Sequence, residues 1–251
     1  MGAHDQYDSL AEDYDWLFSD RTLTGEPQVG ELQPILERLP PGARILDSAC
    51  GTGLVAFALA RHGFRVRGTD ASVGMITSSR RNATGAAIQV PFDPCRWEDL
   101  PGPIDERFDL VLCGGNAIGH CRDEAEMLRS LRGLRRVLAD GGLLVVDSRN
   151  WEKLRRERVR FTHFGQRLRD GIRCVPVYVW TFPEEPTAPH TIDVLLVLEQ
   201  GGNITLRSYP ITYYPFRYDE LAARLTRAGF TDLETDFAAD QATYHVVARA
   251  A

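Results

Sequence analysis

The sequence predicts an α/β protein with a doubly wound central sheet, followed by a separate antiparallel layer. Two observations carry this prediction. Up to about residue 150, short apolar runs alternate with amphipathic stretches of helical period, which is typical of parallel strands joined by right-handed helical crossovers. After Asp147 the runs are longer, rich in β-forming residues and separated by Pro-rich or Gly-Gly turns, as in an antiparallel meander.

The chain begins with segments of helical period. Val29–Leu39 has apolar residues at helical spacing, after the shorter segments Tyr7–Tyr14 and Trp16–Phe18. Pro40-Pro41-Gly42 ends this region. We expect residues 1–40 to form lid helices over the core that follows.

The doubly wound core is expected over residues 41–150. Phe108–Cys113 is a continuous apolar run, as expected of a parallel strand covered on both faces. Ser72 is predicted to cap one helix, and Gly141-Gly142 to end another. The predicted elements, in order, are strand Arg44–Asp47, helix Leu54–His62, strand Arg65–Thr69, a helix from Ser72 to about Arg81, strand Ile88–Val90, strand Phe108–Cys113, helix Asp123–Leu138 and strand Leu143–Asp147.

Two further segments complete the chain. Residues 151–215 are expected to form an antiparallel β cap inserted after the core, and residues 216–251 a closing helix and strand pair that place an antiparallel strand in the main sheet. The predicted elements are strands Ile172–Phe182, Thr191–Glu199 and Asn203–Tyr214, helix Tyr218–Ala228 ended by Gly229, and strands Asp232–Phe237 and Thr243–Ala248.

The composition limits the function. A chain of 251 residues with ordinary apolar and charged fractions can bury one good core. A formal net charge of −6 gives no basic face for nucleic acid, and the basic cluster Arg155–Arg158 is expected on a solvated helix face. The five cysteines have neither zinc nor disulfide spacing, and no signal-like or membrane-spanning run is found. We expect a cytoplasmic protein without a metal site.

The most informative segment is Asp47-Ser-Ala-Cys-Gly-Thr-Gly53, directly after the first predicted strand. Gly51 and Gly53 let the backbone turn sharply and approach a ligand, and the helix that follows presents free N–H groups. Asp70 ends the next strand, roughly 20 residues on, where a carboxylate can accept both ribose hydroxyls. Two glycines after a strand can also make a simple βα turn, so the turn and Asp70 together predict the nucleotide site.

The acid that leads the turn indicates which nucleotide binds. A carboxylate at Asp47 would repel a pyrophosphate, whereas it suits a ligand with a cationic amino group. S-adenosylmethionine carries both an ammonium and a sulfonium. The sequence therefore favours this methyl donor over a dinucleotide.

Other polar and aromatic residues follow the predicted strands, and in a doubly wound sheet ligands bind beyond those carboxyl ends. Met75 could equally belong to the core, Trp97 could cover the sheet edge, and His120 could lie in a surface loop. Arg149 and Asn150 at a strand end both need polar partners. The residues near the five strand ends are Asp47, Ala49, Gly51 and Gly53; Asp70, Ala71 and Met75; Arg96 and Trp97; Cys113, Asn116 and His120; and Asp147 and Arg149.

These motifs together carry a family resemblance. The Asp47–Gly53 turn, Thr69-Asp-Ala-Ser-x-x-Met75, Trp97, Gly115-Asn-x-x-x-His120 and the segment Gly141–Trp151, with its Asp-x-Arg-Asn-Trp ending, cover most of the chain. The chain resembles the glycine and sarcosine N-methyltransferases among the class I S-adenosylmethionine-dependent enzymes. The last two motifs are the more particular to that group, and Tyr209-Pro210 is a fainter match.

The resemblance implies a Rossmann-like sheet, S-adenosylmethionine as cofactor and a role for each matching residue. Arg149 is the strongest candidate for substrate choice, because a planar guanidinium pairs bidentately with a carboxylate. The implied roles are ribose binding by Asp70; adenine contact by Ala71, Met75, Arg96 and Trp97; contact with the methionine part by Asp47, Ala49, Gly51, Gly53, the Cys113 backbone and His120; lid contacts by Tyr7, Tyr14 and Arg21; and acceptor binding by Asn116, Arg149 and Tyr209.

The chain also departs from the family pattern. The segment before Asn116 is Cys-Gly-Gly, the segment after it is Ala117-Ile118-Gly119, and Arg96 replaces an amide. The smaller side chains predict more room beside Asn116, which argues against glycine as the acceptor and favours a larger amine.

The expected reaction is in-line displacement at the methyl carbon, with a small molecule as acceptor. Positioning can lower such a barrier by roughly 7 to 11 kcal/mol, more than the ~10²- to 10⁴-fold of one general base. The alternatives are methyl transfer to oxygen or carbon with His120 or Asp147 as base, a non-catalytic module that binds the cofactor, and a nicotinamide-dependent oxidoreductase. The resemblance leaves the oligomeric state open and is compatible with a homo-oligomer.

Overall fold

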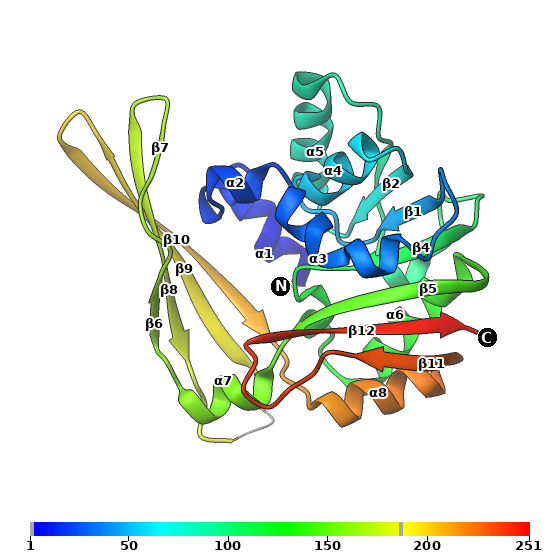
Figure 1. The fold of residues 1–251 in the computed structure, drawn as a ribbon. Helices are drawn as coiled ribbons and strands as arrows, with labels where there is room; N and C mark the ends of the chain where they lie inside the picture. Colours follow the sequence, from blue (N-terminus) through cyan, green and yellow to red (C-terminus); the bar gives the residue numbers. More distant parts are fainter. Residues whose placement is uncertain (1–2, 186–187) are drawn as a thin grey trace.

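The computed structural model describes residues 3–185 and 188–251. Two sheets lie at an angle to each other, with the N-terminal helices between them (Figure 1). The N-terminal elements are α1 (Ala3–Leu10), the short 3₁₀ helix η1 (Tyr14–Leu17), α2 (Asp20–Leu23) and α3 (Glu26–Leu36). The core elements are β1 (Arg44–Asp47), α4 (Leu54–Arg61), β2 (Arg65–Asp70), α5 (Val73–Ala86), β3 (Phe92–Pro94), η2 (Trp97–Asp99), β4 (Phe108–Cys113), η3 (Ala117–His120), α6 (Glu124–Arg136) and β5 (Leu138–Arg149). The later elements are α7 (Trp151–Glu157), β6 (Phe161–His163), β7 (Arg167–Arg169), β8 (Ile172–Thr181), β9 (His190–Gln200), β10 (Asn203–Tyr213), α8 (Tyr218–Arg227), β11 (Phe230–Thr235) and β12 (Thr243–Ala250).

The main sheet has the strand order β11-β12-β5-β4-β1-β2-β3 within the described residues. Strands β1 to β5 are parallel, and β12 is antiparallel to both of its neighbours. The order reverses between β1 and β4, where a doubly wound sheet binds its ligand. The predicted fold class and its antiparallel last strand are confirmed.

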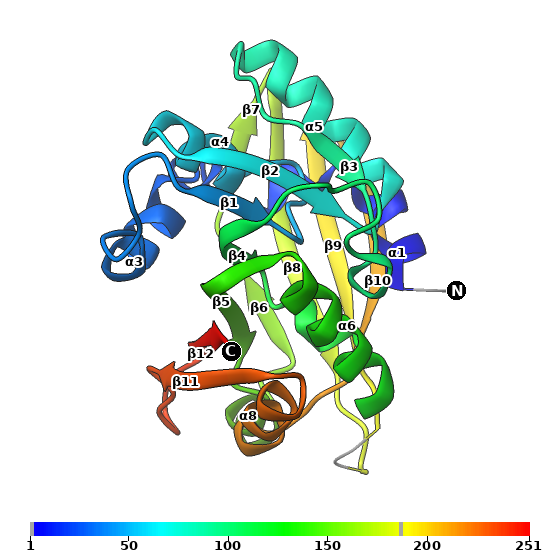
Figure 2. The same ribbon diagram turned by 90° about the vertical axis from the view of Figure 1, so that its right-hand side faces the viewer.

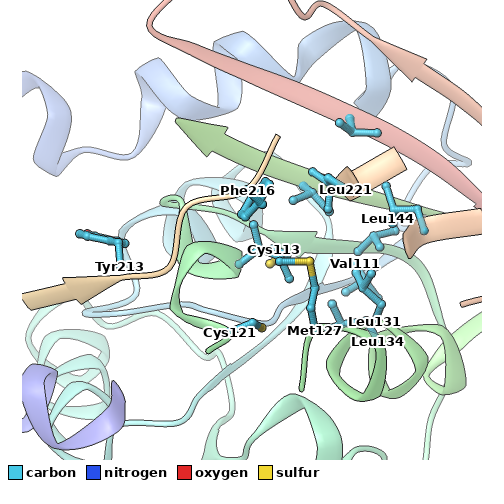
Figure 3. Packing of buried hydrophobic residues seen from close by; sticks show 14 of the residues in the cluster. Val111, Cys113, Cys121, Met127, Leu131, Leu134, Leu144, Tyr213, Phe216 and Leu221 are labelled. Atoms are coloured by element: carbon cyan, nitrogen blue, oxygen red, sulfur yellow. The ribbon is translucent and has the colours of Figure 1, made fainter. Parts of the chain in front are cut away.

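Helices cover both faces of this sheet, because successive side chains of each central strand point to opposite faces. Leu46 and Val111 pack in one core with residues of α6 and α8, such as Leu131. Ile45 and Leu110 point the other way and pack with residues of α3 and α4. Figure 3 shows the first of these cores around Val111 and Leu131.

The second sheet has the order β10-β9-β8-β6, with β7 also paired to β8, and all its pairings are antiparallel. The predicted meander is therefore confirmed, apart from β6 and β7, which are three residues long and too short to show a period. This cap sheet lies beyond the carboxyl ends of the parallel strands, as a layer separate from the main sheet (Figure 1), and its strands run behind the main sheet in the turned view (Figure 2). No helix of the described residues has the length and apolar character needed to cross a bilayer.

The predicted strand Ile88–Val90 is wrong. The third strand is Phe92–Pro94, because Gly68 N–H of β2 donates to the Pro91 carbonyl and Gly68 pairs with Phe92. Helix α5 runs on to Ala86 instead of ending near Arg81. The prolines around this strand fit because it is the edge of the sheet, where a missing N–H costs no ladder bond.

Gly141 and Gly142 do not end α6, which also corrects the sequence prediction. The helix ends at Arg136, and β5 begins two residues later at Leu138. The register of β5 against β4 then jumps from Leu138 to Leu143, and the two glycines lie in this irregular stretch. Gly141 has φ 71°, and a Cβ on Gly142 would lie 3.0 Å from the Phe108 carbonyl oxygen.

Candidate active site

Two adjoining cavities lie at the carboxyl edge of the parallel strands. Their volumes are about 120 Å³ and about 230 Å³. Both are lined by Tyr14, the Ala49–Gly51 turn and the Gly114-Gly115 pair, so they meet at the switch point between β1 and β4. Among the predicted site residues, the smaller cavity is also lined by Asp70, Ala71, Met75, Arg96, Trp97 and His120, and the larger by Asp47.

The glycine turn holds Asp70 in place. Gly51, with φ 51°, donates its N–H to Asp70 Oδ2 at 2.9 Å, and Ser72 N–H donates to Oδ1 at 2.9 Å. Burial raises the pKa of Asp70, while the two backbone donors oppose that shift. The carboxylate is thus fixed in orientation and lines the smaller cavity, where its remaining lone pairs can accept ribose hydroxyls.

Asp47 lines the larger cavity, and its pKa is shifted strongly upward. Burial and, second, the like charge of Asp70 raise its pKa from 3.8 to about 7, against the effect of backbone N–H groups of Ala49 and Ala56. The carboxyl is 4% exposed. An ammonium brought near it would favour the ionised form, so this acid is poised to bind a cation.

An apolar wall closes the smaller cavity. Met75 is buried in the protein and also lines the cavity, so it belongs to both the core and the site. Trp97 donates Nε1–H to the Ser48 carbonyl at 2.7 Å, which fixes its ring beside the β1 turn. Ala71 and Arg96 complete this side. The flat apolar surface suits an adenine ring.

The N-terminal segment is tied to both layers of the protein. Asp8 of α1 accepts hydrogen bonds from Ser72 Oγ at 2.5 Å and Gly74 N–H at 2.8 Å, at the beginning of α5. Gln6 Oε1 accepts the N–H of Thr212 on β10 at 2.5 Å. Thr52 of the cofactor turn donates to Asp15 at 2.7 Å. These contacts place Tyr7 and Tyr14 as the roof of the smaller cavity.

His120 lies beneath this roof. Its Nε2 is 2.9 Å from the Tyr7 hydroxyl, and its Nδ1 is 3.0 Å from the Thr212 carbonyl oxygen. The ring stacks on Tyr213 at a centroid distance of 4.4 Å. His120 is therefore a wall of the cavity and is not in a surface loop.

Asn116 and Arg149 form a pair just behind the lining. Asn116 has φ 60°, and its Oδ1 accepts the backbone N–H of Arg149 at 2.9 Å. Its Nδ2 and Arg149 Nε are both buried, and neither has a hydrogen-bond partner among the described residues. The Arg149 guanidinium lies 5.4 Å from the Trp180 ring. Across residues 3–185 and 188–251, no carboxylate lies within ion-pair distance of it, although Asp147 interacts with it electrostatically from farther away.

The structure does not bring Tyr209 or Arg21 to the cavities. The Tyr209 hydroxyl donates to Asp13, which also binds Arg207 at 2.6 Å. Tyr209 thus holds the N-terminal segment on the cap sheet instead of facing an acceptor. Arg21 is exposed on the short helix α2 and lines neither cavity, contrary to the sequence prediction.

Two predicted residues act only through the backbone. The Cys113 side chain points into the core near Met127 (Figure 3), although its chain leads directly into Gly114 of the cavity wall. Gly53, with φ 93°, lines neither cavity. A Cβ there would lie 2.8 Å from the Phe57 ring, so its role is to start α4 against that ring.

The expected room after Asn116 is only partly present. A Cβ on Gly119 would lie 2.9 Å from Trp151 and 3.3 Å from Tyr213, so aromatic rings fill that space. A Cβ on Gly114 or Gly115 would meet nothing within 4 Å, and both residues line the two cavities. The open space is therefore before Asn116, in the Gly-Gly pair.

Three aromatic residues of the cap sheet were not predicted as site residues. Tyr178, Trp180 and Tyr213 lie on the face of the cap sheet that packs toward the core. Strand alternation in β8 could have placed Tyr178 and Trp180 on one face. It could not have shown that this face meets Arg149. No cluster of three or more potential metal ligands occurs in the part of the chain that the structure describes.

Comparisons with known proteins agree with this geometry. Residues 45–142 match the model of a family described as a methyltransferase domain. The chain is 29% identical over 212 residues to a glycine/sarcosine N-methyltransferase of Aphanothece halophytica, covering 80% of this chain and 71% of that one. The chain is a class I S-adenosylmethionine-dependent methyltransferase. It is also 33% identical to the glycine N-methyltransferase of Oryctolagus cuniculus, with 68% of this chain and 64% of the relative aligned.

Solved methyltransferase structures share the fold over the whole chain. The CcbJ methyltransferase from Streptomyces caelestis superposes with a TM-score of 0.77 at 22% identity, covering 100% of both chains. The sugar N-methyltransferase KedS8 from Streptoalloteichus gives 0.72 at 21%, covering 94% of this chain and 92% of that one. At this identity the two structures show the shared fold alone. The methyltransferase-domain match and the N-methyltransferase relatives set aside the nicotinamide-dependent and non-catalytic alternatives.

The residues present fit the cofactor of this methyltransferase, S-adenosylmethionine. Asp70 would hold the ribose, Met75 and Trp97 the adenine, and Asp47 the ammonium of the methionine part. The raised pKa of Asp47 is in keeping with this fit, because a cation bound beside a buried acid favours its charged form. When bound, the cofactor supplies an electrophilic methyl group.

Proposed function

We propose that this methyltransferase acts on the amine nitrogen of a small, carboxylate-bearing metabolite, such as an amino acid larger than glycine. The observation that carries the proposal is Arg149, a guanidinium with a buried, unpartnered Nε at the end of β5. The names of the relatives, glycine and glycine/sarcosine N-methyltransferases, support nitrogen as the methylated atom.

Arg149 is half-buried and its Nε is buried. A guanidinium that makes no ion pair is costly wherever burial removes the water that solvates its charge. Arg149 keeps a contact with the Trp180 ring but makes no ion pair with a carboxylate of the described residues, and Asp147 acts on it only from beyond ion-pair distance. A carboxylate of the acceptor would pair with it in a bidentate manner and offset that cost. Arginine suits this role because it stays protonated in any environment.

Asn116 adds a second donor to the same place. Its Oδ1 is used by the Arg149 N–H, so its amide is fixed with Nδ2 as the free end. The side chain is 6% exposed. An unpartnered buried N–H group is unfavourable, and an acceptor oxygen would satisfy it. Two donors without partners next to one another support an acceptor that carries an acidic group.

The space at Gly114-Gly115 supports an acceptor larger than glycine. These residues separate Asn116 from the cofactor turn and line both cavities. Neither would carry a Cβ into a neighbouring protein atom. An acceptor held by its carboxylate at Arg149 could extend its side chain here.

Binding and orientation are the main tasks of the protein in this reaction. The nitrogen lone pair must lie in line with the bond that breaks, and anchoring the carboxylate restricts the acceptor to such poses. The roof formed by Tyr7 and Tyr14 excludes water that would solvate the amine. Methyl transfer then forms the C–N bond while the C–S electrons pass to sulfur.

The proposal can be tested with purified enzyme and radiolabelled methyl donor. Amino acids of increasing size would be compared with their decarboxylated amines and with the matching hydroxy acids. We expect methylation on nitrogen of carboxylate-bearing amines only, and Arg149→Ala to raise the acceptor KM at least 100-fold. Arg132→Ala, at an exposed arginine of α6, is the matched control. Equal turnover of the decarboxylated amines, or an unchanged KM in Arg149→Ala, would contradict the proposal.

A further inference from the structure

We propose that Tyr7 and His120 form a proton relay that takes a proton from the acceptor amine before methyl transfer. The inference rests on the proposed nitrogen acceptor and goes beyond it, because it gives a chemical task to two residues otherwise assigned to the roof and wall of the cavity. Free aliphatic amines are mostly protonated at neutral pH, and a protonated nitrogen has no lone pair with which to attack. A group at the site that takes up this proton would let the protonated amine, the major form in solution, be used directly.

The hydrogen bonds fix the tautomer of His120. A carbonyl oxygen only accepts, so the 3.0 Å contact of His120 Nδ1 with the Thr212 carbonyl requires a proton on Nδ1. In the neutral ring Nε2 is then the acceptor, and the Tyr7 hydroxyl donates to it at 2.9 Å. The basic nitrogen of His120 is therefore directed at Tyr7, and Tyr7 lies at the cavity.

The chain of hydrogen bonds continues on the other side of Tyr7. The Tyr213 hydroxyl lies 3.3 Å from the Tyr7 hydroxyl. Since Tyr7 gives its own proton to His120, its oxygen accepts from Tyr213 and keeps a second lone pair. Both Tyr7 and His120 line the smaller cavity together with Ala117, next to Asn116. This lone pair can accept from an amine bound in the cavity.

The surroundings suit a relay instead of a phenolate. Burial, followed by the neighbouring phenols, raises the pKa of Tyr7 well above its ordinary value, so its hydroxyl stays protonated and can only pass a proton on. The Thr212 carbonyl stabilises the imidazolium that results. The titratable groups that act on Tyr7 are Tyr213 of β10, Tyr14 of η1 and Tyr178 of β8. One step farther out, Arg149 of β5 acts on Tyr178, and the carboxylates of Asp70 and Asp15 act on Tyr14.

The proton and electron balance is complete. The amine N–H⁺ bond breaks toward Tyr7 oxygen while the Tyr7 proton passes to His120 Nε2, which leaves a neutral amine and an imidazolium. The freed lone pair attacks the methyl carbon, the C–S bond breaks and its electrons stay on sulfur. The product leaves as a methylated ammonium, and His120 returns its proton to water. One proton is released for each methyl group.

The relay exists only while the N-terminal helix is docked. Tyr7 belongs to α1, which is held by Asp8 at the beginning of α5 and by Gln6 on β10. Thr212, which orients His120 through its carbonyl, is the same residue whose N–H binds Gln6. Docking of α1 and assembly of the relay are thus one event.

The test is the pH dependence of kcat/KM for the best amine acceptor, measured for His120→Gln and Tyr7→Phe. We expect at least a 100-fold loss at pH 7 in His120→Gln and a 10- to 100-fold loss in Tyr7→Phe, in keeping with the ~10²- to 10⁴-fold typical of proton transfer. The kcat/KM of both variants should rise about tenfold per pH unit until the pH reaches the pKa of the free amine. Over this range the neutral fraction of the amine in solution increases, and the variants can bind that form directly. Wild type should change much less over that range. His163→Asn, at an exposed histidine of β6, is the control.

The outcomes separate the two proposals. Equal pH profiles for wild type and both variants, with nitrogen still methylated, would overturn the relay alone. Methylation on oxygen or carbon would overturn the proposed function together with amine deprotonation. Because a substitution at His120 can disturb packing against Tyr213, Tyr7→Phe keeps the test valid: it removes one hydroxyl, and calorimetry should show cofactor affinity within about threefold of wild type.

Discussion

Asn116 Oδ1 accepts the backbone N–H of Arg149 at 2.9 Å and so joins the end of β4 to the end of β5. The bond brings together the two residues that carry the unpartnered groups of the site, Asn116 Nδ2 just before η3 and Arg149 Nε at the end of β5. The geometry that supports acceptor binding is therefore also part of the sheet, and substitutions at either residue should affect both.

Asn116→Ala should lower both stability and acceptor affinity. The left-handed φ of 60° disfavours Ala, and the Arg149 N–H would lose its partner in a buried place, at a combined cost of about 2–4 kcal/mol. Asn116→Gly avoids the backbone strain, but like Ala it leaves the Arg149 N–H without its partner. We expect its unfolding free energy to lie between wild type and Ala, with an acceptor KM as poor as that of Ala. Equal KM values for wild type and Gly would contradict a role in binding.

Asp70→Ala should weaken S-adenosylmethionine about 100-fold or more. The carboxylate organises the Gly51 turn and is available to the ribose, and hydrogen bonds to charged groups contribute roughly 1.5–3 kcal/mol each. Isothermal titration calorimetry measures the effect, with Asp105→Asn on an exposed loop as control. Unchanged affinity in Asp70→Ala would show that the ribose lies elsewhere.

Cofactor affinity should fall as pH falls through about 7. The pKa of Asp47 is raised to about 7, so below that pH the carboxyl of the free enzyme is protonated and its attraction for an ammonium is lost. Asp47→Asn should bind S-adenosylmethionine weakly and with little pH dependence between 6 and 8. Titrations at three pH values check both statements, and a wild-type affinity that is flat over this range would contradict them.

The same group should make the ligand-free protein less stable at high pH. Its pKa in the folded state lies above its ordinary 3.8, so ionisation costs stability, beginning above pH 4 and reaching its full size above pH 7. Asp47→Asn removes this cost. We expect the variant to be more stable than wild type at pH 8, by at most about 4 kcal/mol, and the difference to shrink toward pH 4. Denaturant unfolding at both pH values measures it.

Gly119→Ala and Gly114→Ala should have opposite consequences. A Cβ at Gly119 would overlap Trp151, which should cost about 1–3 kcal/mol of stability. A Cβ at Gly114 meets no neighbour but enters the cavity, so the fold should be unaffected while large acceptors lose affinity more than small ones. Melting curves and acceptor KM values distinguish the two. A Gly114→Ala enzyme with unchanged acceptor preference would show that the acceptor does not use this space.

Tyr209→Phe should loosen the lid without changing acceptor recognition. Tyr209 and Arg207 both bind the buried Asp13, and through it they hold the N-terminal segment on the cap sheet. We expect a faster cofactor off-rate, similar to that of Asp13→Asn, and an acceptor KM within about threefold of wild type. A large rise in acceptor KM with an unchanged cofactor off-rate would show instead that Tyr209 contacts the acceptor.

Much of the core was predictable because its signals are local. Strand β1 was predicted with its observed bounds, and Ser72 does cap α5, since both depend on residues within a few positions of one another. The third strand was missed because β3 lies at an edge, where few apolar residues are needed and Pro91 and Pro94 are tolerated. The Gly141-Gly142 pair was misassigned because a strand bulge and a helix end use the same residues.

The sequence alone determined the cofactor site, since the turn Asp47–Gly53 and Asp70 belong to neighbouring strands and a short helix joins them. Only the tertiary structure decided the acceptor side. Tyr7 meets His120 from 113 residues away, and Tyr209 is taken up by Asp13 across 196 residues. A polar group can bind a ligand only if residues distant in the sequence do not already occupy it as hydrogen-bond partners in the folded protein. Arg149 Nε is available because no hydrogen-bond partner from the described part of the chain reaches it, and no pattern along the sequence records that.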